Sequence, residues 1–130
     1  MGNQILSVAE VCYMAFNAGY TDSVIMLTDN DTVASFPRIV DVSFCYGRVQ
    51  ISMKTCIMVD PYAPACRAPF SSECLTVREL FAYVCQFNHQ TKPLCLCDSS
   101  GLAYMVTPEA LSIRGGRLLI DISVCVAREI

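Results

Sequence analysis

The chain has 130 residues, of which 54% are apolar and only 16% are charged. A soluble domain is on average about 45–50% apolar and about 25% charged. The composition therefore excludes a disordered chain and predicts one compact domain over residues 1–130. Nine basic residues against twelve acidic ones leave a net charge of −3, which argues against a nucleic-acid role driven by bulk charge.

Nine cysteines are many for a chain of this length, and their number is odd. Most of them lie within apolar periodic segments, where a free thiol behaves as a small buried hydrophobe. The first residues also lack the charged and long apolar regions of a secretory signal. We therefore expect a reduced protein of the cytoplasm rather than a disulfide framework.

A membrane-spanning helix is not predicted, because no segment reaches the ~18 consecutive apolar residues that one requires. The start of the chain is similar to a myristoylation signal at Gly2, but Leu6 occupies the position that requires Ser or Thr. Membrane association would therefore be peripheral, with Gly2 as the candidate site of acylation.

The first predicted helix runs from Ser7 to Gly19. Ser7 and Glu10 have the spacing of a capping box, and Gly19 is a typical residue at a helix C-terminus. Two short strands are predicted after it, at 24–27 and 32–36.

A period-two pattern over residues 38–59 predicts a hairpin with one buried face. The apolar face of its first strand comprises Val40, Val42, Phe44 and Tyr46. That of its second strand comprises Val49, Ile51, Met53, Thr55, Ile57 and Val59. The proline-rich stretch 60–74 that follows predicts a long loop, and long loops in compact domains are often functional.

A second helix is predicted from Thr76 to about Asn88, with Thr76 and Glu79 in capping-box spacing. A second hairpin over 94–106, a helical turn beginning at Pro108 and a long final strand over 117–127 follow. We expect no internal repeat.

From 38 to 127 the order is hairpin, helix, hairpin, helical turn and strand, which resembles the ubiquitin-like β-grasp. The likeness is carried by the hairpin 40–59, the helix Thr76-Val77-Arg78-Glu79-Leu80 and the segment 94–120. The same order is similar to a viral matrix-like fold. Both predict an α+β domain in which a mixed sheet of two hairpins and a long C-terminal strand packs on one or two amphipathic helices. Residues 1–37 add an N-terminal helix and short strands.

One cluster of candidate metal ligands stands out. Cys85 and His89 are four residues apart, so a continuous helix would place them on one face. Cys95 and Cys97 are two apart, so a strand would place them on one side. Four nitrogen and sulfur ligands suit tetrahedral zinc. The alternative is a set of buried, inert thiols and a solvated histidine, because the usual zinc spacings are absent.

The functional expectation is a non-catalytic, intracellular protein that binds a protein partner, most simply a second copy of itself. Two alternatives are a matrix-like, peripherally membrane-associated assembly protein and a small zinc-dependent factor. We expect no catalytic residues and no cofactor, because the carboxylates do not pair and the single histidine lies in a polar segment. The candidate interaction residues come from the long loop and the outer face of the last strand: Tyr62, Arg67, Phe70, Leu119 and Cys125.

Overall fold

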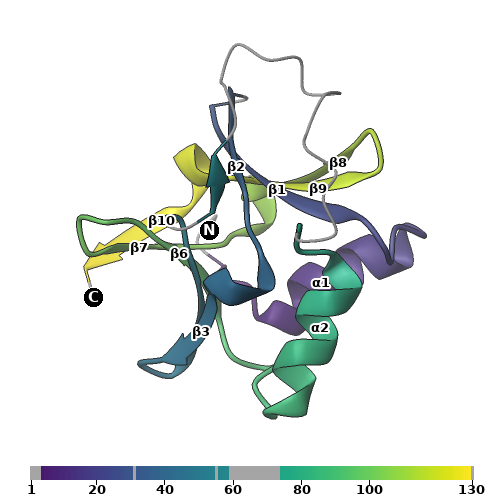
Figure 1. Ribbon diagram of the computed structural model, residues 1–130, viewed down its shortest axis with the longest axis horizontal. Helices are drawn as coiled ribbons and strands as arrows, with labels where there is room; N and C mark the ends of the chain where they lie inside the picture. Colours follow the sequence, from purple (N-terminus) through teal and green to yellow (C-terminus); the bar gives the residue numbers. More distant parts are fainter. Residues whose placement is uncertain (1–3, 31, 55, 59–73, 130) are drawn as a thin grey trace.

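A computed structural model describes residues 4–30, 32–54, 56–58 and 74–129. It confirms the α+β class (Figure 1): the described residues form two α-helices and two five-stranded sheets. The strand orders are β5-β2-β1-β9-β8 and β10-β7-β6-β4-β3. Each sheet is mixed, because one of its neighbouring pairs is parallel and the others are antiparallel. The strands thus divide between two sheets, whereas the β-grasp and matrix-like patterns predicted one.

The first half of the chain contains α1 (Val8–Asn17), β1 (Val24–Asp29), β2 (Thr32–Phe36), the 3-10 helix η1 (Ile39–Asp41), β3 (Val42–Cys45), β4 (Arg48–Ser52) and β5 (Ile57–Met58). The second half contains α2 (Val77–Gln86), β6 (Leu94–Cys97), β7 (Leu102–Met105), η3 (Pro108–Ala110), β8 (Leu111–Arg114), β9 (Arg117–Asp121), η4 (Ile122–Val124) and β10 (Val126–Glu129).

These two halves are a repeat, and our expectation of no internal repeat was wrong. The helices α1 and α2 have the same length and begin 69 residues apart, at Val8 and Val77. The same offset of 69 separates η1 from η3, β3 from β8 and β4 from β9, each pair with equal bounds. Adding 69 to a residue number in the first half therefore gives its counterpart in the second.

Side chains and backbone conformations follow the same offset. Identical residues at paired positions include Glu10 and Glu79, Asp29 and Asp98, Gly47 and Gly116, Arg48 and Arg117, and Cys56 and Cys125. Positive φ values recur at paired positions as well: +82° at Gly19 and +63° at Asn88, which follow the two helices, and +70° at Gly47 and +73° at Gly116, in the two hairpin turns.

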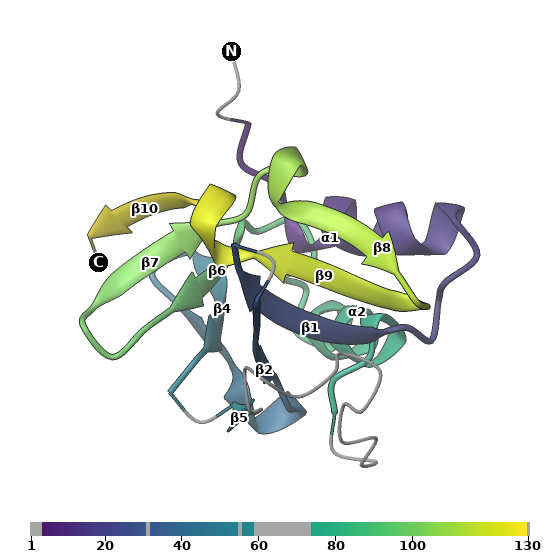
Figure 2. The same ribbon diagram turned by 90° about the horizontal axis from the view of Figure 1, so that it is seen from above.

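The halves are joined by exchange of strands. Strand β1 of the first half pairs in parallel with β9 of the second, with Ile25 opposite Leu118. Strand β6 of the second half pairs in parallel with β4 of the first, with Leu94 opposite Val49. These two pairs are equivalent under the offset. Figure 2 shows β8 and β9 beside β1, and β4 beside β6, so each sheet takes two strands from the other half.

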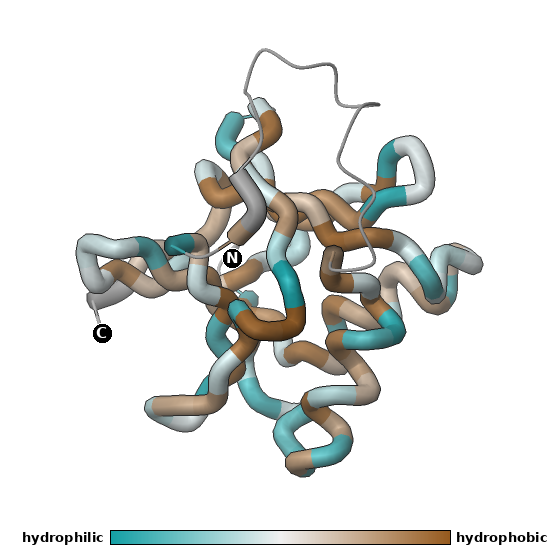
Figure 3. The backbone as a smooth tube through the Cα atoms, viewed as in Figure 1, coloured by the Kyte–Doolittle hydropathy of each residue, from teal (hydrophilic) through white to brown (hydrophobic). Residues whose placement is uncertain are grey.

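One main core fills the space among the two sheets and the two helices. The helices contribute Val8, Val11, Val77, Leu80 and Val84. The four strands of the two parallel pairs, β1, β9, β4 and β6, contribute Ile25, Leu27, Val49, Ile51, Leu94, Leu96, Leu118 and Ile120. Hydrophobic segments recur along both helices and the central strands (Figure 3). Smaller apolar clusters on other strand faces include Met26, Phe36, Cys74 and Leu119 in the first sheet, and Cys95, Ala103 and Met105 in the second.

The predicted first strand of the hairpin begins later than expected. Residues 39–41 form the 3-10 turn η1, which leaves Val40 72% exposed and Asp41 2% exposed, the reverse of the predicted faces. The Asp41 carboxylate accepts a hydrogen bond from the Arg38 backbone N–H at 2.7 Å. This local bond stabilises the turn and delays the strand until Val42.

Two long predicted strands are each divided between the sheets. The second hairpin strand ends at Ser52, and β5 then pairs with β2 in the other sheet. The final strand ends at Asp121, passes through η4, and β10 pairs with β7. The Asp121 carboxylate accepts from the Ser123 N–H at 3.0 Å and so caps the intervening turn. Strand β8, which the sequence did not predict, forms a hairpin with β9.

Both predicted helix N-termini are confirmed, and they generate the first prediction. The Ser7 hydroxyl accepts from the Glu10 N–H at 3.2 Å, and the Thr76 hydroxyl accepts from the Glu79 N–H at 3.1 Å. The hydroxyl bond is common to both caps, whereas the reciprocal bond from the Ser7 N–H to Glu10 Oε1, at 3.0 Å, completes a capping box in α1. Because each substitution removes the shared hydroxyl bond, Ser7→Ala and Thr76→Ala are each expected to lower the free energy of unfolding by about 1 kcal/mol in urea titrations.

The control for these two substitutions is Thr91→Ala, at an exposed loop position, which should change stability by less than about 0.5 kcal/mol. A loss confined to one of the two capping variants would contradict the structural equivalence of the halves.

Candidate functional site

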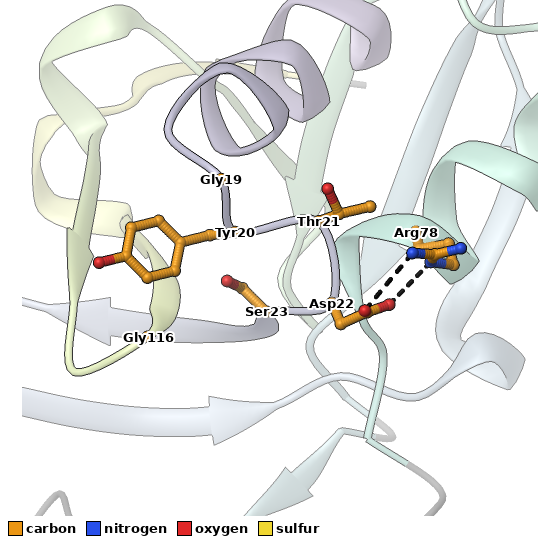
Figure 4. A pocket seen from close by; sticks show the side chains of 7 residues that line it. All are labelled: Gly19, Tyr20, Thr21, Asp22, Ser23, Arg78 and Gly116. Atoms are coloured by element: carbon orange, nitrogen blue, oxygen red, sulfur yellow. Dashed lines mark hydrogen bonds and ion pairs between the residues drawn. The ribbon is translucent and has the colours of Figure 1, made fainter.

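Two pockets lie at equivalent places in the two halves. Each is bounded by the loop that follows one helix and by the hairpin turn of the opposite half. The first pocket, of about 360 Å³, is lined by Gly19, Tyr20, Thr21, Asp22, Ser23, Arg78 and Gly116 (Figure 4). The second, of about 270 Å³, is lined by Phe44, Cys45, Gly47, Arg48, His89 and Lys92. Under the offset, Tyr20 matches His89, Ser23 matches Lys92, and Gly116 matches Gly47.

The first pocket carries balanced charge. Arg78 Nε lies 2.7 Å from Asp22 Oδ1, and both side chains are largely exposed. In Figure 4 this ion pair occupies one side of the pocket, while the Tyr20 ring points towards the hairpin that carries Gly116. The remaining lining groups are hydroxyls and backbone, so this pocket attracts neither ionic sign strongly.

The second pocket is cationic. Arg48 and Lys92 are permanently positive at neutral pH, and His89 adds an imidazole. No carboxylate is among the described residues that line it. The positions that match Asp22 and Arg78 are held by Thr91 and Ala9, so the ion pair of the first pocket has no counterpart here. A local excess of positive charge thus occurs in a chain whose net charge is −3.

Two nitrogens of the second pocket's lining residues lack a hydrogen-bond partner. Arg48 Nε and His89 Nδ1 are both buried, and neither is bonded to any described residue. A buried polar nitrogen left unbonded costs about 1–3 kcal/mol, so such groups need a partner. Ser23 Oγ of the first pocket is likewise buried without a hydrogen-bond partner, so this feature is common to both pockets and does not by itself select a ligand.

A cluster of aromatic rings adjoins this pocket. The Phe44 ring centroid lies 5.3 Å from that of Tyr83, 5.2 Å from that of Phe87 and 4.8 Å from that of His89. Phe87 is nevertheless 47% exposed. The counterparts of Phe44, Tyr83 and Phe87 are Ile113, Met14 and Ala18. The region around the first pocket, formed by α1 and the β8–β9 hairpin, therefore folds without these aromatic residues.

Tyr46 lies in the β3–β4 turn beside the pocket. It is 77% exposed, and its φ of +53° is in the left-handed region. Its counterpart is Gly115, with φ +57°. The Arg48 guanidinium carbon lies 5.6 Å from the Tyr46 ring centroid, within the range of a cation–π contact. An L-residue in this conformation costs about 1–2 kcal/mol, which glycine avoids.

The predicted zinc ligands are not brought together. Helix α2 ends at Gln86, and the left-handed Asn88 turns the chain, so His89 does not continue the helical face of Cys85. The Cys85 thiol instead lies near Cys12, whose pKa is raised first by burial and further by this neighbour. Within the described part of the chain, no three His, Cys, Asp or Glu side chains could hold a metal ion.

Cys95 and Cys97 do share one side of β6, as predicted, and their sulfur atoms are 3.9 Å apart. The Cys97 thiol donates to Gln50 Oε1 at 2.8 Å, and Gln50 Nε2 donates to the Cys45 sulfur. The buried amide is therefore satisfied by thiols. The counterpart of Gln50 in the first sheet is Leu119. Nothing in the sequence pattern indicated the contact between Gln50 and these thiols.

The predicted interaction residues have different outcomes. Gly2 and the loop residues Tyr62, Arg67 and Phe70 lie outside the described residues. Leu119 is only 7% exposed and packs in the cluster of Met26 and Phe36, so it does not form the outer surface that we expected. Cys125 is partly buried, and its thiol donates to the Asp121 carbonyl oxygen at 3.4 Å.

Neither helix of the described structure has the length and apolar character needed to cross a membrane. Comparisons with protein-family models, with curated proteins and with solved structures find no match to this chain. The functional argument therefore depends on the geometry of the chain itself.

The buried thiols generate the second prediction. Burial raises the pKa values of Cys12, Cys56, Cys95 and Cys125 to about 12, from an ordinary value of 9.0. Between pH 9 and about 12 these thiols stay protonated when folded but ionise when unfolded. The unfolded chain then binds fewer protons, so the free energy of unfolding should fall as pH rises through this window.

Cys12→Ala isolates one of these groups. This variant should be less stable at neutral pH, yet its stability should decline less steeply above pH 9 than that of the wild type, as measured by urea titration at each pH. Equal slopes for the two proteins would contradict a strongly raised pKa at Cys12.

Proposed function

We propose that this chain is a non-catalytic binding protein that docks an acidic segment of a protein partner. The docking site is the aromatic–cationic surface, defined as Phe44, Tyr46, Arg48, Tyr83, Phe87, His89 and Lys92. The observation that carries the proposal is Tyr46, an exposed aromatic residue held in a left-handed turn beside a cationic pocket.

Stability alone does not account for Tyr46. Its side chain is mostly exposed, so its burial contributes little, and the left-handed conformation favours the glycine found at position 115. Strained residues of this kind are concentrated at binding and active sites. Tyrosine and arginine are also the residue types that dominate binding energy at protein interfaces.

The neighbouring aromatic residues support the same proposal. The matching positions near the first pocket hold Ile113, Met14 and Ala18 in place of Phe44, Tyr83 and Phe87. The aromatic set is therefore an addition beyond what this fold requires. It gives the pocket an apolar border that a partner's side chain can cover.

Charge selects the partner. Arg48 and Lys92 line a pocket with no carboxylate among its described lining residues, which complements an acidic segment and repels a basic one. The self-association that the sequence led us to expect depended on an exposed sheet face, and Leu119 of that face is buried. Binding of a second copy of the chain is therefore one outcome of the test below, and a rise in the solution mass would show it.

The third prediction concerns Tyr46→Gly. Selection of displayed random short peptides on the full chain should enrich acidic residues next to apolar ones. We expect Tyr46→Gly to weaken the best peptide at least tenfold in fluorescence anisotropy titrations. Because glycine suits the left-handed turn, the free energy of unfolding should stay unchanged or rise by about 1 kcal/mol.

Tyr20→Ser is the control, because it removes the exposed tyrosine that lines the other pocket. It should leave peptide affinity within about twofold. Enrichment of basic peptides, or equal affinities for wild type and Tyr46→Gly, would overturn the proposal. Binding that appears only as a concentration-dependent rise in the solution mass would assign the surface to a second copy.

A further inference from the structure

Comparison of the two pockets separates features that the shared backbone imposes from features that belong to one pocket alone. The same backbone forms both, yet the second exchanges Tyr20 for His89 and Ser23 for Lys92, and it lacks the Asp22–Arg78 ion pair. The exchange of Ser23 for Lys92 adds a positive charge, and the loss of the ion pair removes the only carboxylate among the described lining residues of the first pocket. The second pocket therefore keeps Arg48 and Lys92 without a carboxylate beside them, an arrangement that favours an anionic ligand.

We propose that the pocket of Arg48, His89 and Lys92 binds the phosphoryl group of a phosphorylated side chain. That the side chain belongs to a docked protein segment rests on the function proposed above, whereas the anion site stands on the pocket itself. A phosphate monoester carries a charge of about −1.5 to −2 at neutral pH and three strong acceptor oxygens. The pocket offers two permanent positive charges and an imidazole against it.

The cationic side chains that line the pocket fit this ligand. The N–H groups of a guanidinium form a planar fork that matches phosphate oxygens, and a lysine ammonium adds a point charge. Oxygens of a phosphoryl group in the cavity would accept from the guanidinium of Arg48 and the ammonium of Lys92, the two cationic residues that line it.

Size and shape restrict the ligand further. The cavity of about 270 Å³ is smaller than the roughly 300–1,000 Å³ of sites for drug-sized molecules, which favours one side chain over a nucleotide. The Phe44 ring forms part of its wall beside the cations. An aryl phosphate, which joins a flat ring to a dianion, therefore suits the pocket better than inorganic phosphate does.

The test titrates the full chain with three probes, phenyl phosphate, inorganic phosphate and benzoate. Binding is monitored through the NMR signals of the Gly47 and Lys92 amides. Phenyl phosphate should give saturable shifts and the highest affinity, followed by inorganic phosphate and then benzoate. Arg48→Gln and Lys92→Gln should each lower the affinity for phenyl phosphate at least tenfold. Lys54→Gln removes the same charge from an exposed position outside the pocket, and it should change the affinity less than twofold.

The possible outcomes distinguish a phosphorylated side chain from free phosphate as the ligand, and they separate failure of the anion site from failure of the docking surface. If phenyl phosphate and inorganic phosphate bind with equal affinity, the pocket is a site for free phosphate. That result would overturn the proposal that the ligand is a phosphorylated side chain. Shifts that are absent, or that respond equally to Lys92→Gln and Lys54→Gln, would overturn the anion site. If acidic peptides still bind in that case, the docking surface stands without it; if phenyl phosphate binds but no peptide does, the anion site stands and the docking function fails.

Discussion

The parallel pairing of strands between the two halves is the constraint on which the rest of the structure depends. In one sheet β1 lies beside β9, with β8 beyond it, and in the other sheet β6 lies beside β4, with β3 beyond it. In both central pairs apolar residues face each other in the same register, Ile25 with Leu118 and Leu94 with Val49. Neither half contains a complete sheet, and a half alone would expose strand edges and the inner apolar face.

The segments before the helices reinforce this exchange. The Leu6 N–H donates to the Val106 carbonyl at 2.9 Å, and at the matching place the Leu75 N–H donates to the Pro37 carbonyl at 2.8 Å. Each bond joins one half to the other. Helices α1 and α2 also contact each other, and their rings meet where Phe16 lies 5.4 Å from Phe81. The two halves are thus joined by backbone hydrogen bonds, by strand pairing and by contacts between the helices.

The exchange also builds the two pockets. Each requires a loop that follows the helix of one half and a hairpin turn from the other. Because the backbone is duplicated, the pair serves as an internal comparison: what both pockets share reflects the fold, and what only one has reflects its own chemistry. Tyr46, His89 and Lys92 belong to the second kind, since Gly115, Tyr20 and Ser23 hold the matching positions.

Local signals in the sequence predicted local structure well. The capping boxes at Ser7 and Thr76 located both helices, and the turn after Cys97 located the β6–β7 hairpin. The same reasoning failed where a strand changes sheet, after Ser52 and after Asp121, because an alternating pattern does not say which neighbour a strand pairs with. The repeat is hard to recognise in the sequence, because apart from Gly47-Arg48 and Gly116-Arg117 its identities are scattered singly over the 69-residue offset.

The candidate site was less predictable than the fold. His89 was recognised as the only histidine, but its grouping with Arg48 and Lys92 joins residues from two halves that only the strand exchange brings together. Tyr46 was assigned to a buried strand face, because a tyrosine in a left-handed turn contradicts local preference. Comparison of Tyr46 with Gly115 at the offset of 69 was the signal that could have revealed it.

Native-state hydrogen exchange of the full chain tests most directly whether the crossed pairing unites the two halves. Amides of β1, β9, β4 and β6 should open together, with one free energy equal to that of global unfolding and the same dependence on denaturant. Protection in one half that survives while the other half exchanges through a separate, smaller opening would contradict the account.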